Sequence, residues 1–148
     1  MSWIEDRLGQ RKRLKEHRQI IAEGAESLFE SLWQEIVGNV KEAAEKGLQV
    51  GTNGAGYERI VWESMTPRPG QRSANRKEVK ITLRKEREAV SISETTPLSE
   101  PYDFQITVDD NGVVSLAFNG AKWSIQKAAQ FILDRFLFPD VQIHEPKL

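Results

Sequence analysis

Two consecutive stretches of alternating apolar and polar residues, within residues 78–118, constrain the fold of this chain more than any other feature. Residues 78–84 carry an apolar side chain at every second position, which is the period of a β-strand with one buried face. The charged segment 85–88 that follows contains no glycine for a two-residue turn. We therefore expect a four-residue loop and an antiparallel hairpin in which Leu83 lies opposite Val90.

A second hairpin is predicted from residues 104–108 and 114–118, whose apolar side chains must share one face of the sheet. A two-residue Asn-Gly loop would send the two apolar sets to opposite faces, because a shift of one residue reverses every side chain. A three-residue loop, 110–112, instead pairs Val108 with Val114. We expect this loop, with its glycine in a left-handed bulge.

A long amphipathic helix precedes the strands. Ser2 and Glu5 have the spacing of a capping box, and Gly47 is the left-handed residue expected just after a helix. The helix would be about 65 Å long, which exceeds the diameter of a domain of this size, so Gly9 and Gly24 are candidate positions for a bend. Its apolar residues at helical spacing are Ile21, Ala25, Leu28, Phe29, Leu32, Trp33, Ile36, Val40 and Ala43.

The segments between the helix and the first hairpin are predicted to be a linker, a strand and a loop. Residues 51–56 are glycine-rich, but they follow a helix and precede a strand, the reverse of a phosphate-binding loop, so we interpret them as a flexible linker. Residues 57–65 contain the apolar core of a strand. Residues 66–77 are polar and basic and contain two prolines, which indicates a mobile surface loop.

The C-terminal region predicts one more helix. Ser124 is a suitable N-cap, and Pro139 is expected to end the helix. Val141 and Ile143 in the tail indicate a short additional strand. The chain is thus predicted to form a single α+β domain over residues 1–148. A long N-terminal helix and a C-terminal helix would cover the same face of an antiparallel sheet of four or five strands built from hairpins. Residues 1–20 would be a basic helical extension that projects.

The residue composition offers little support for catalysis. The chain has no cysteine, which excludes a disulfide scaffold, a thiolate metal site and a cysteine nucleophile. Its two histidines, His17 and His144, have no neighbouring pattern of ligands. No serine lies in a nucleophile-elbow motif. We therefore expect no cofactor, no metal and no catalytic residue, and we favour a non-catalytic protein.

Charges are segregated along the chain. Residues 7–18 hold six Lys or Arg and one acid, whereas residues 23–45 hold six acids and one Lys. A helix that is basic at one end and acidic afterwards complements a second copy lying antiparallel, and its apolar stripe is longer than a small sheet can cover. The leading hypothesis is a binding or adaptor module that binds a protein partner or forms a homodimer through the N-terminal helix.

A nucleic-acid-binding protein is the first alternative, because the basic segments 7–18 and 68–77 could neutralise phosphates if the fold placed them on one side. The sequence pI of 6.2 and the lack of aromatic residues in both segments argue against it. The candidate contacts to nucleic acid or another anion are Arg11, Lys12, Arg13, Lys15, Arg18, Arg68, Arg72, Arg76 and Lys77.

The second alternative is a domain that binds a small apolar ligand, or an enzyme, with a site between the sheet and the helices. Aromatic residues from several strands would line that site, although they are equally typical of a core. The candidate lining residues are Tyr57, Trp62, Phe104 and Phe118. The N-terminus lacks the features of a secretory signal and no apolar run would span a bilayer, so we expect a cytoplasmic protein without a membrane partner.

Overall fold

The computed structural model describes residues 2–65, 76–95 and 100–144. Within these residues the chain forms a long first helix, α1 (Trp3–Glu45), then a sheet, and finally the helices α2 (Ile125–Leu137) and α3 (Pro139–His144). The strands are β1 (Val50–Ala55), β2 (Glu58–Ser64), β3 (Arg76–Arg84), β4 (Ala89–Glu94), β5 (Tyr102–Val108), β6 (Val114–Phe118) and β7 (Ala121–Trp123).

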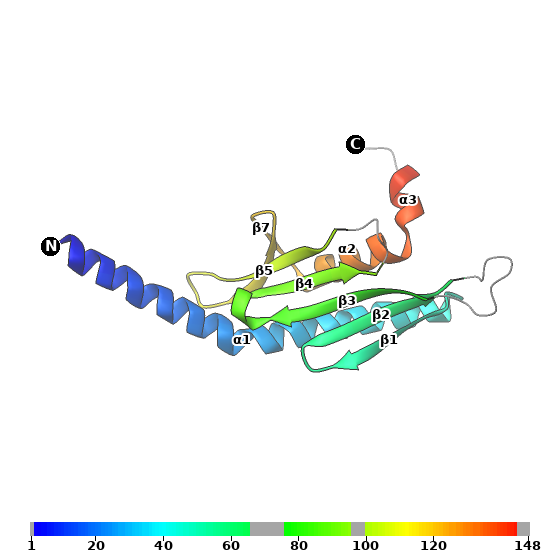
Figure 1. Ribbon diagram of the computed structural model, residues 1–148, viewed down its shortest axis with the longest axis horizontal. Coiled ribbons are helices and arrows are strands. Elements are labelled where there is room, and N and C mark those ends of the chain that lie inside the picture. Colours follow the sequence, from blue (N-terminus) through cyan, green and yellow to red (C-terminus); the bar gives the residue numbers. More distant parts are fainter. Residues whose placement is uncertain (1, 66–75, 96–99, 145–148) are drawn as a thin grey trace.

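The seven described strands lie in the sheet in their order along the chain, and every neighbouring pair is antiparallel. Helices α1 and α2 cover one face of this sheet, and among the described residues the other face is open (Figure 1). The predicted α+β class, antiparallel sheet and placement of both helices on one face are therefore confirmed.

Both predicted hairpin registers are confirmed. Leu83 pairs with Val90 across the loop 85–88, in which Glu88 adopts a left-handed backbone with φ of 51°. Val108 pairs with Val114, and Gly112 in the following loop has φ of 78°. The Asp109 carboxylate organises this second loop, because it accepts hydrogen bonds of 2.9 Å from the backbone N–H groups of Asn111 and Val113.

The prediction of four or five strands was wrong, because the sheet also contains β1 and β7 among its seven described strands. The glycine-rich segment 51–56 is mostly strand β1 rather than a linker. Gly51 lies opposite Trp62, and a Cβ atom at Gly51 would stand 2.3 Å from the indole ring, so the missing side chain makes room for that ring.

Strand β7 follows a turn that reverses the chain within two residues. Asn119 and Gly120 have φ angles of 52° and 80°, and two successive positive values are the requirement of a type I′ hairpin turn. The chain therefore pairs back on β6 before α2 begins. There the Ser124 hydroxyl accepts a hydrogen bond of 3.1 Å from the backbone N–H of Lys127, which confirms the predicted N-cap.

The C-terminal tail differs from expectation, and of the predicted mobile loop only the last two residues are described. The residue before Pro139 leaves the helical conformation, as residues before proline tend to do, and Pro139 then starts helix α3 instead of leading to the predicted strand at Val141 and Ile143. Of the predicted loop 66–77, residues 76 and 77 belong to β3 and the others lie outside the described residues.

Helix α1 is continuous for 43 residues, so neither Gly9 nor Gly24 interrupts it. Its first turn is capped by Ser2, whose hydroxyl accepts a hydrogen bond of 3.2 Å from the N–H of Glu5. Its end is closed by Gly47, which has φ of 104°, and by a hydrogen bond of 3.1 Å from the N–H of Leu48 to the carbonyl of Ala43. This is the Schellman arrangement that the sequence predicts.

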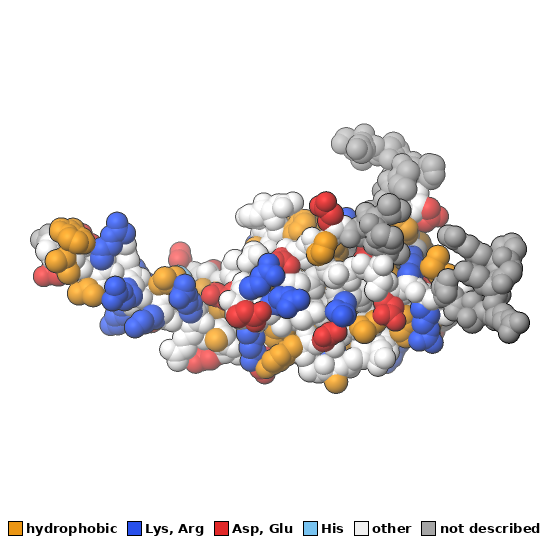
Figure 2. Space-filling model, in the orientation of Figure 1, with side chains coloured by type: hydrophobic (Ala, Val, Ile, Leu, Met, Phe, Trp, Pro, Cys, Tyr) orange, Lys and Arg blue, Asp and Glu red, His pale blue; other side chains and the backbone are white. Residues whose placement is uncertain are grey.

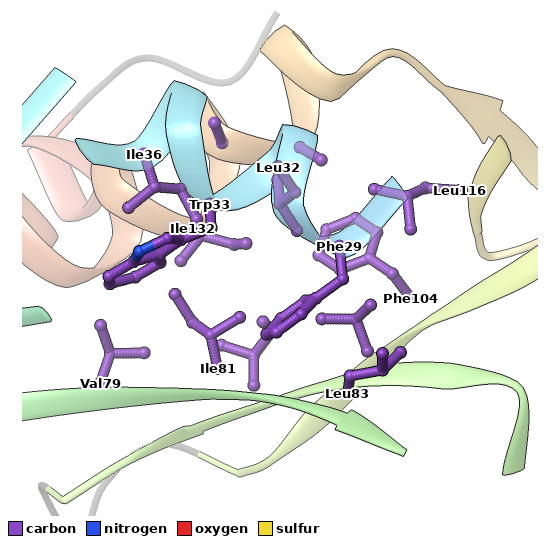
Figure 3. Packing of buried hydrophobic residues seen from close by; sticks show 14 of the residues in the cluster. Phe29, Leu32, Trp33, Ile36, Val79, Ile81, Leu83, Phe104, Leu116 and Ile132 are labelled. Carbon is purple, nitrogen blue, oxygen red and sulfur yellow. The ribbon is translucent and has the colours of Figure 1, made fainter. Parts of the chain in front are cut away.

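The hydrophobic core lies between the sheet, α1 and α2 (Figure 3). Helix α1 contributes side chains from Ile21 to Val40, so only its C-terminal part packs on the sheet. Leu32 and Ile36 at the centre are fully buried against Ile81 of β3 and Ile132 of α2. The predicted apolar stripe of the helix is thus the one that faces the core.

Two glycines of α1 give a matched test of this packing. At Gly38 an added Cβ meets nothing within 4 Å, so Gly38→Ala should raise the free energy of unfolding by about 0.5–1 kcal/mol through helix propensity. At Gly24 the Cβ would stand 2.8 Å from Cγ2 of Val114, a side chain that is stiff at χ1. Gly24→Ala should therefore destabilise the protein in urea unfolding. An equal rise in the free energy of unfolding for the two variants would show that β6 does not pack against Gly24.

Candidate functional site: the projecting segment of the first helix

The N-terminal part of α1 extends beyond the sheet. We call residues 3–19 the projection, which extends away from the sheet (Figure 1). Every residue in it except Gly9 is exposed, and the first buried residue of the helix is Ile21. Neither the sheet nor α2 lies beside this segment. The projection accounts for more than a third of the helix and offers its whole circumference to other molecules.

Four large apolar side chains of the projection are exposed: Trp3 at 73%, Ile4 and Leu8 at 53%, and Leu14 at 51%. Leu14 precedes the buried Ile21 by seven residues, which is close to two turns, and Trp3 precedes Leu14 by eleven residues, which is close to three turns. These side chains therefore continue the stripe that packs the core. Single exposed apolar residues need no explanation, but a continued stripe marks a contact surface.

The projection is also strongly basic, with orange apolar and blue basic side chains intermixed along it (Figure 2). At 100° per residue, Arg7, Arg11 and Arg18 fall on the same side of the helix as Leu14. Among the described residues, none of the six Lys or Arg side chains at positions 7–18 has a carboxylate within ion-pair distance. The cations of this surface thus lack acidic partners within the described fold.

A charged cluster holds α1 against the sheet about two turns after the last residue of the projection. The Glu26 carboxylate accepts hydrogen bonds from the Lys85 ammonium and the Tyr57 hydroxyl, and the ammonium also lies 4.8 Å from the centre of the Tyr57 ring. The bond from Lys85 is the largest cause that lowers the pKa of Glu26, and the bond to Glu26 is the largest cause that raises the pKa of Lys85. The cluster ties two loops of the sheet to the helix.

Arg59 of β2 makes a second attachment one turn further along. Its guanidinium lies 5.8 Å from the centre of the Phe29 ring and 5.6 Å from that of Trp33, and it forms an ion pair of 3.1 Å with Glu30. The Arg59 side chain is only 16% exposed, so this pair is better shielded than a typical surface ion pair. Together the two attachments set the direction in which the projection leaves the domain.

A groove of about 520 Å³ lies between the C-terminal part of α1 and α2. The carboxylates that line it are Glu35, Glu42 and Asp134, and its apolar lining is Ala43, Leu48, Leu133, Leu137 and Phe138. Lys46, the one cation among these lining residues, is paired with Glu42 at 3.1 Å. The groove therefore combines an apolar surface with an excess of negative charge.

The predicted basic residues do not come together. Arg11, Lys12, Arg13, Lys15 and Arg18 lie on the projection, whereas Arg76 and Lys77 begin β3 at the opposite end of the molecule (Figure 1). Arg68 and Arg72 lie outside the described residues.

The two predicted contact residues that begin β3 already have partners within the fold. The Lys77 ammonium forms an ion pair of 3.0 Å with Glu63 and lies 4.9 Å from the centre of the Phe136 ring. The Arg76 guanidinium lies 4.1 Å from the centre of the Trp62 ring. The side chain of Lys77 is only 14% exposed, so it serves the packing of the domain.

The four predicted pocket-lining residues are also dispersed. Phe104 and Phe118 face the helices, with their ring centres 5.2 Å apart, in an aromatic cluster completed by Tyr102, Trp123 and Phe131. Trp62 lies on the other face of the sheet, because it neighbours Val61, which is buried toward the helices, along the strand. Tyr57 is 46% exposed in the turn before β2. These residues do not line one pocket.

The described residues show no metal site. They contain no cluster of three or more His, Cys, Asp or Glu able to hold a metal ion. His17 is exposed on the projection, and the side chain of His144 lies outside the description. No described helix has the length and apolar character needed to cross a membrane. No family model, curated protein or solved structure matches this chain.

The acidic groove is a surface feature that the sequence did not locate. The excess of acids in residues 23–45 includes Glu35 and Glu42, so the sequence signalled the charge. It could not signal that Asp134, far along the chain, would join them beside an apolar surface, because that requires the packing of α2 on α1.

The cluster at the base of the projection predicts a specific titration. The pKa of Glu26 should lie below the ordinary value of a glutamate. Lys85→Met should raise this pKa part of the way back to the ordinary value, as measured by NMR of the carboxyl group. Lys80→Met is the matched control, since Lys80 pairs with Glu58 instead. A lowered pKa in the folded state means that the contact stabilises the fold at pH values above the unfolded pKa, and that this is lost as pH falls through the folded pKa. An unchanged pKa in Lys85→Met would contradict the contact.

Proposed function

We propose that this chain is a non-catalytic binding module whose contact element is the projection, and that it associates with a second copy of itself through that element. The proposal rests on one observation: the core stripe of α1 continues, exposed, through Leu14 to Trp3. A buried stripe needs a sheet or a helix against it, and the projection has neither within the described fold.

The arrangement of charge favours a protein partner over a lipid surface. Helices that lie on membranes separate an apolar face from a basic one. In the projection, Arg7, Arg11 and Arg18 lie within the apolar face. A partner that offers carboxylates next to apolar side chains satisfies both kinds of group, as helices bound in protein grooves do.

The apolar residues also favour protein over nucleic acid. Phosphate contacts would use the Lys and Arg side chains but would leave Ile4, Leu8 and Leu14 exposed. The second basic segment lies at the opposite end of the molecule in its described part, so a nucleic-acid strand would not engage both segments on one face.

The energetic contribution of the projection is sufficient for a moderate affinity. Full burial of a large apolar side chain contributes about 1.5–3 kcal/mol, so burial of a half-exposed one contributes about half of that. Four such side chains in each copy would offset the entropic cost of association, which is at least about 4 kcal/mol. Association would also hold in place a helical segment that is otherwise only marginally stable.

The test is the solution mass by light scattering over a range of protein concentrations at low and high salt. Wild-type protein should associate, and high salt should weaken the association by screening the cations. Trp3→Ser/Leu14→Ser should weaken it at least tenfold, since on the same reckoning the two side chains contribute about 1.5–3 kcal/mol in each copy and a factor of ten requires about 1.4 kcal/mol.

The matched control is Lys12→Ser/Glu16→Ser. It lies on the side of the helix opposite Trp3 and Leu14 and leaves the net charge unchanged, so it should associate as wild type does. Circular dichroism should show that both variants keep the fold. A monomer under all conditions would refute self-association, and a titration with nucleic acid would then be the next measurement.

A further inference from the structure

We infer that the projection of one copy docks in the groove between α1 and α2 of a second copy, as a third helix. This inference rests on the proposed function and names the surface that receives the projection. The groove is lined by the carboxylates of Glu35, Glu42 and Asp134 beside apolar side chains. The projection presents arginines among apolar side chains on one face. The two surfaces are complementary in both respects.

The dimensions agree as well as the chemistry. Along α1 the groove extends from Glu35 to Lys46, eleven residues or about 17 Å of helix. The apolar residues of the projection extend from Trp3 to Leu14, which is also eleven residues and about 17 Å. Phe138, 40% exposed at one end of the groove, offers an apolar contact for this segment.

A copy cannot occupy its own groove. The projection and one wall of the groove belong to the same uninterrupted helix, and Leu8 lies 31 residues before Asn39 in the groove. At 1.5 Å per residue these positions are about 46 Å apart along the axis. Docking therefore has to occur between copies.

Two projections are also poor partners for each other. Each carries six Lys or Arg between residues 7 and 18, so side-by-side projections bring like charges together. The acidic part of α1 cannot offer its own apolar stripe, because that stripe is buried from Ile21 to Val40. In the groove, by contrast, acids of this helix lie next to accessible apolar side chains. Each copy has one projection and one groove. In a pair, each projection can therefore dock in the groove of the other copy, and the assembly is complete as a dimer.

The decisive experiment reverses charge on each side and then mixes the variants. Glu42→Lys/Asp134→Lys changes two exposed acids of the groove, and Arg7→Glu/Arg11→Glu changes two exposed bases of the projection. Each variant alone should associate at least tenfold more weakly than wild type by light scattering. An equimolar mixture should regain the dimer, because each groove then meets a projection of opposite charge.

Glu86→Lys/Asp110→Lys is the control for net charge. These acids are exposed in loops of the sheet, away from the groove, and the substitution changes the net charge by the same amount. It should leave association at the wild-type level. If it weakens association as much as the groove variant does, or if mixing restores nothing, the proposed docking is wrong.

The two proposals fail in different ways. Loss of association in Trp3→Ser/Leu14→Ser, together with wild-type association in Glu42→Lys/Asp134→Lys, would overturn the groove as the receiving surface and leave the function of the projection intact. Wild-type association in both would overturn the two proposals together.

Site-specific cross-linking gives a second measurement that does not depend on affinity. The chain contains no cysteine, so a cysteine introduced in each of two variants forms disulfides only where they meet. Leu8→Cys mixed with Gln130→Cys, which lies in the groove, should form a mixed disulfide dimer. Leu8→Cys mixed with Gln105→Cys, exposed on the open face of the sheet, should not. The reverse result would refute the docking.

Discussion

Burial of the C-terminal half of α1 against the sheet is the interaction on which the rest of the structure depends. Helix α2 is 13 residues long, or about 20 Å, and cannot cover one face of the broad sheet alone. Helix α1 supplies seven buried side chains, with Leu32 and Ile36 at the centre of the core. Helix α1 is longer than the sheet measured along the helix axis (Figure 1). When its C-terminal part packs on the sheet, its N-terminal part therefore extends beyond the sheet.

The segregation of charge along the chain follows from the same arrangement. Acids in the packed half of α1 meet cations of the sheet, as in the pairs of Glu26 with Lys85 and of Glu30 with Arg59. Negative charge of the helix is thus partly matched within the domain. The cations of the projection have no such partners among the described residues, and they accompany the exposed part of the apolar stripe. Unpaired charge and exposed apolar side chains therefore coincide on the projection.

The sequence predicted those elements whose signal is local. Alternation and loop chemistry set the register of Val108 with Val114, because a wrong loop length would have exposed an apolar face. Strand β1 was missed because Gly51 serves the close approach of Trp62, a contact between strands that composition does not reveal. Strand β7 was signalled by the Asn119-Gly120 turn, but its three residues are too few for periodicity. The groove depends on Asp134 and α1 meeting in space, which no local pattern encodes.

The meander order of the sheet has a consequence for synthesis of the chain. Each strand pairs with its sequence neighbours, so the hairpins can form one after another as the chain emerges. The partners that cover α1 include β5, β6 and α2, which are made after it. Helix α1 is therefore synthesised before the elements that bury it, and its apolar stripe stays uncovered until those elements have been made.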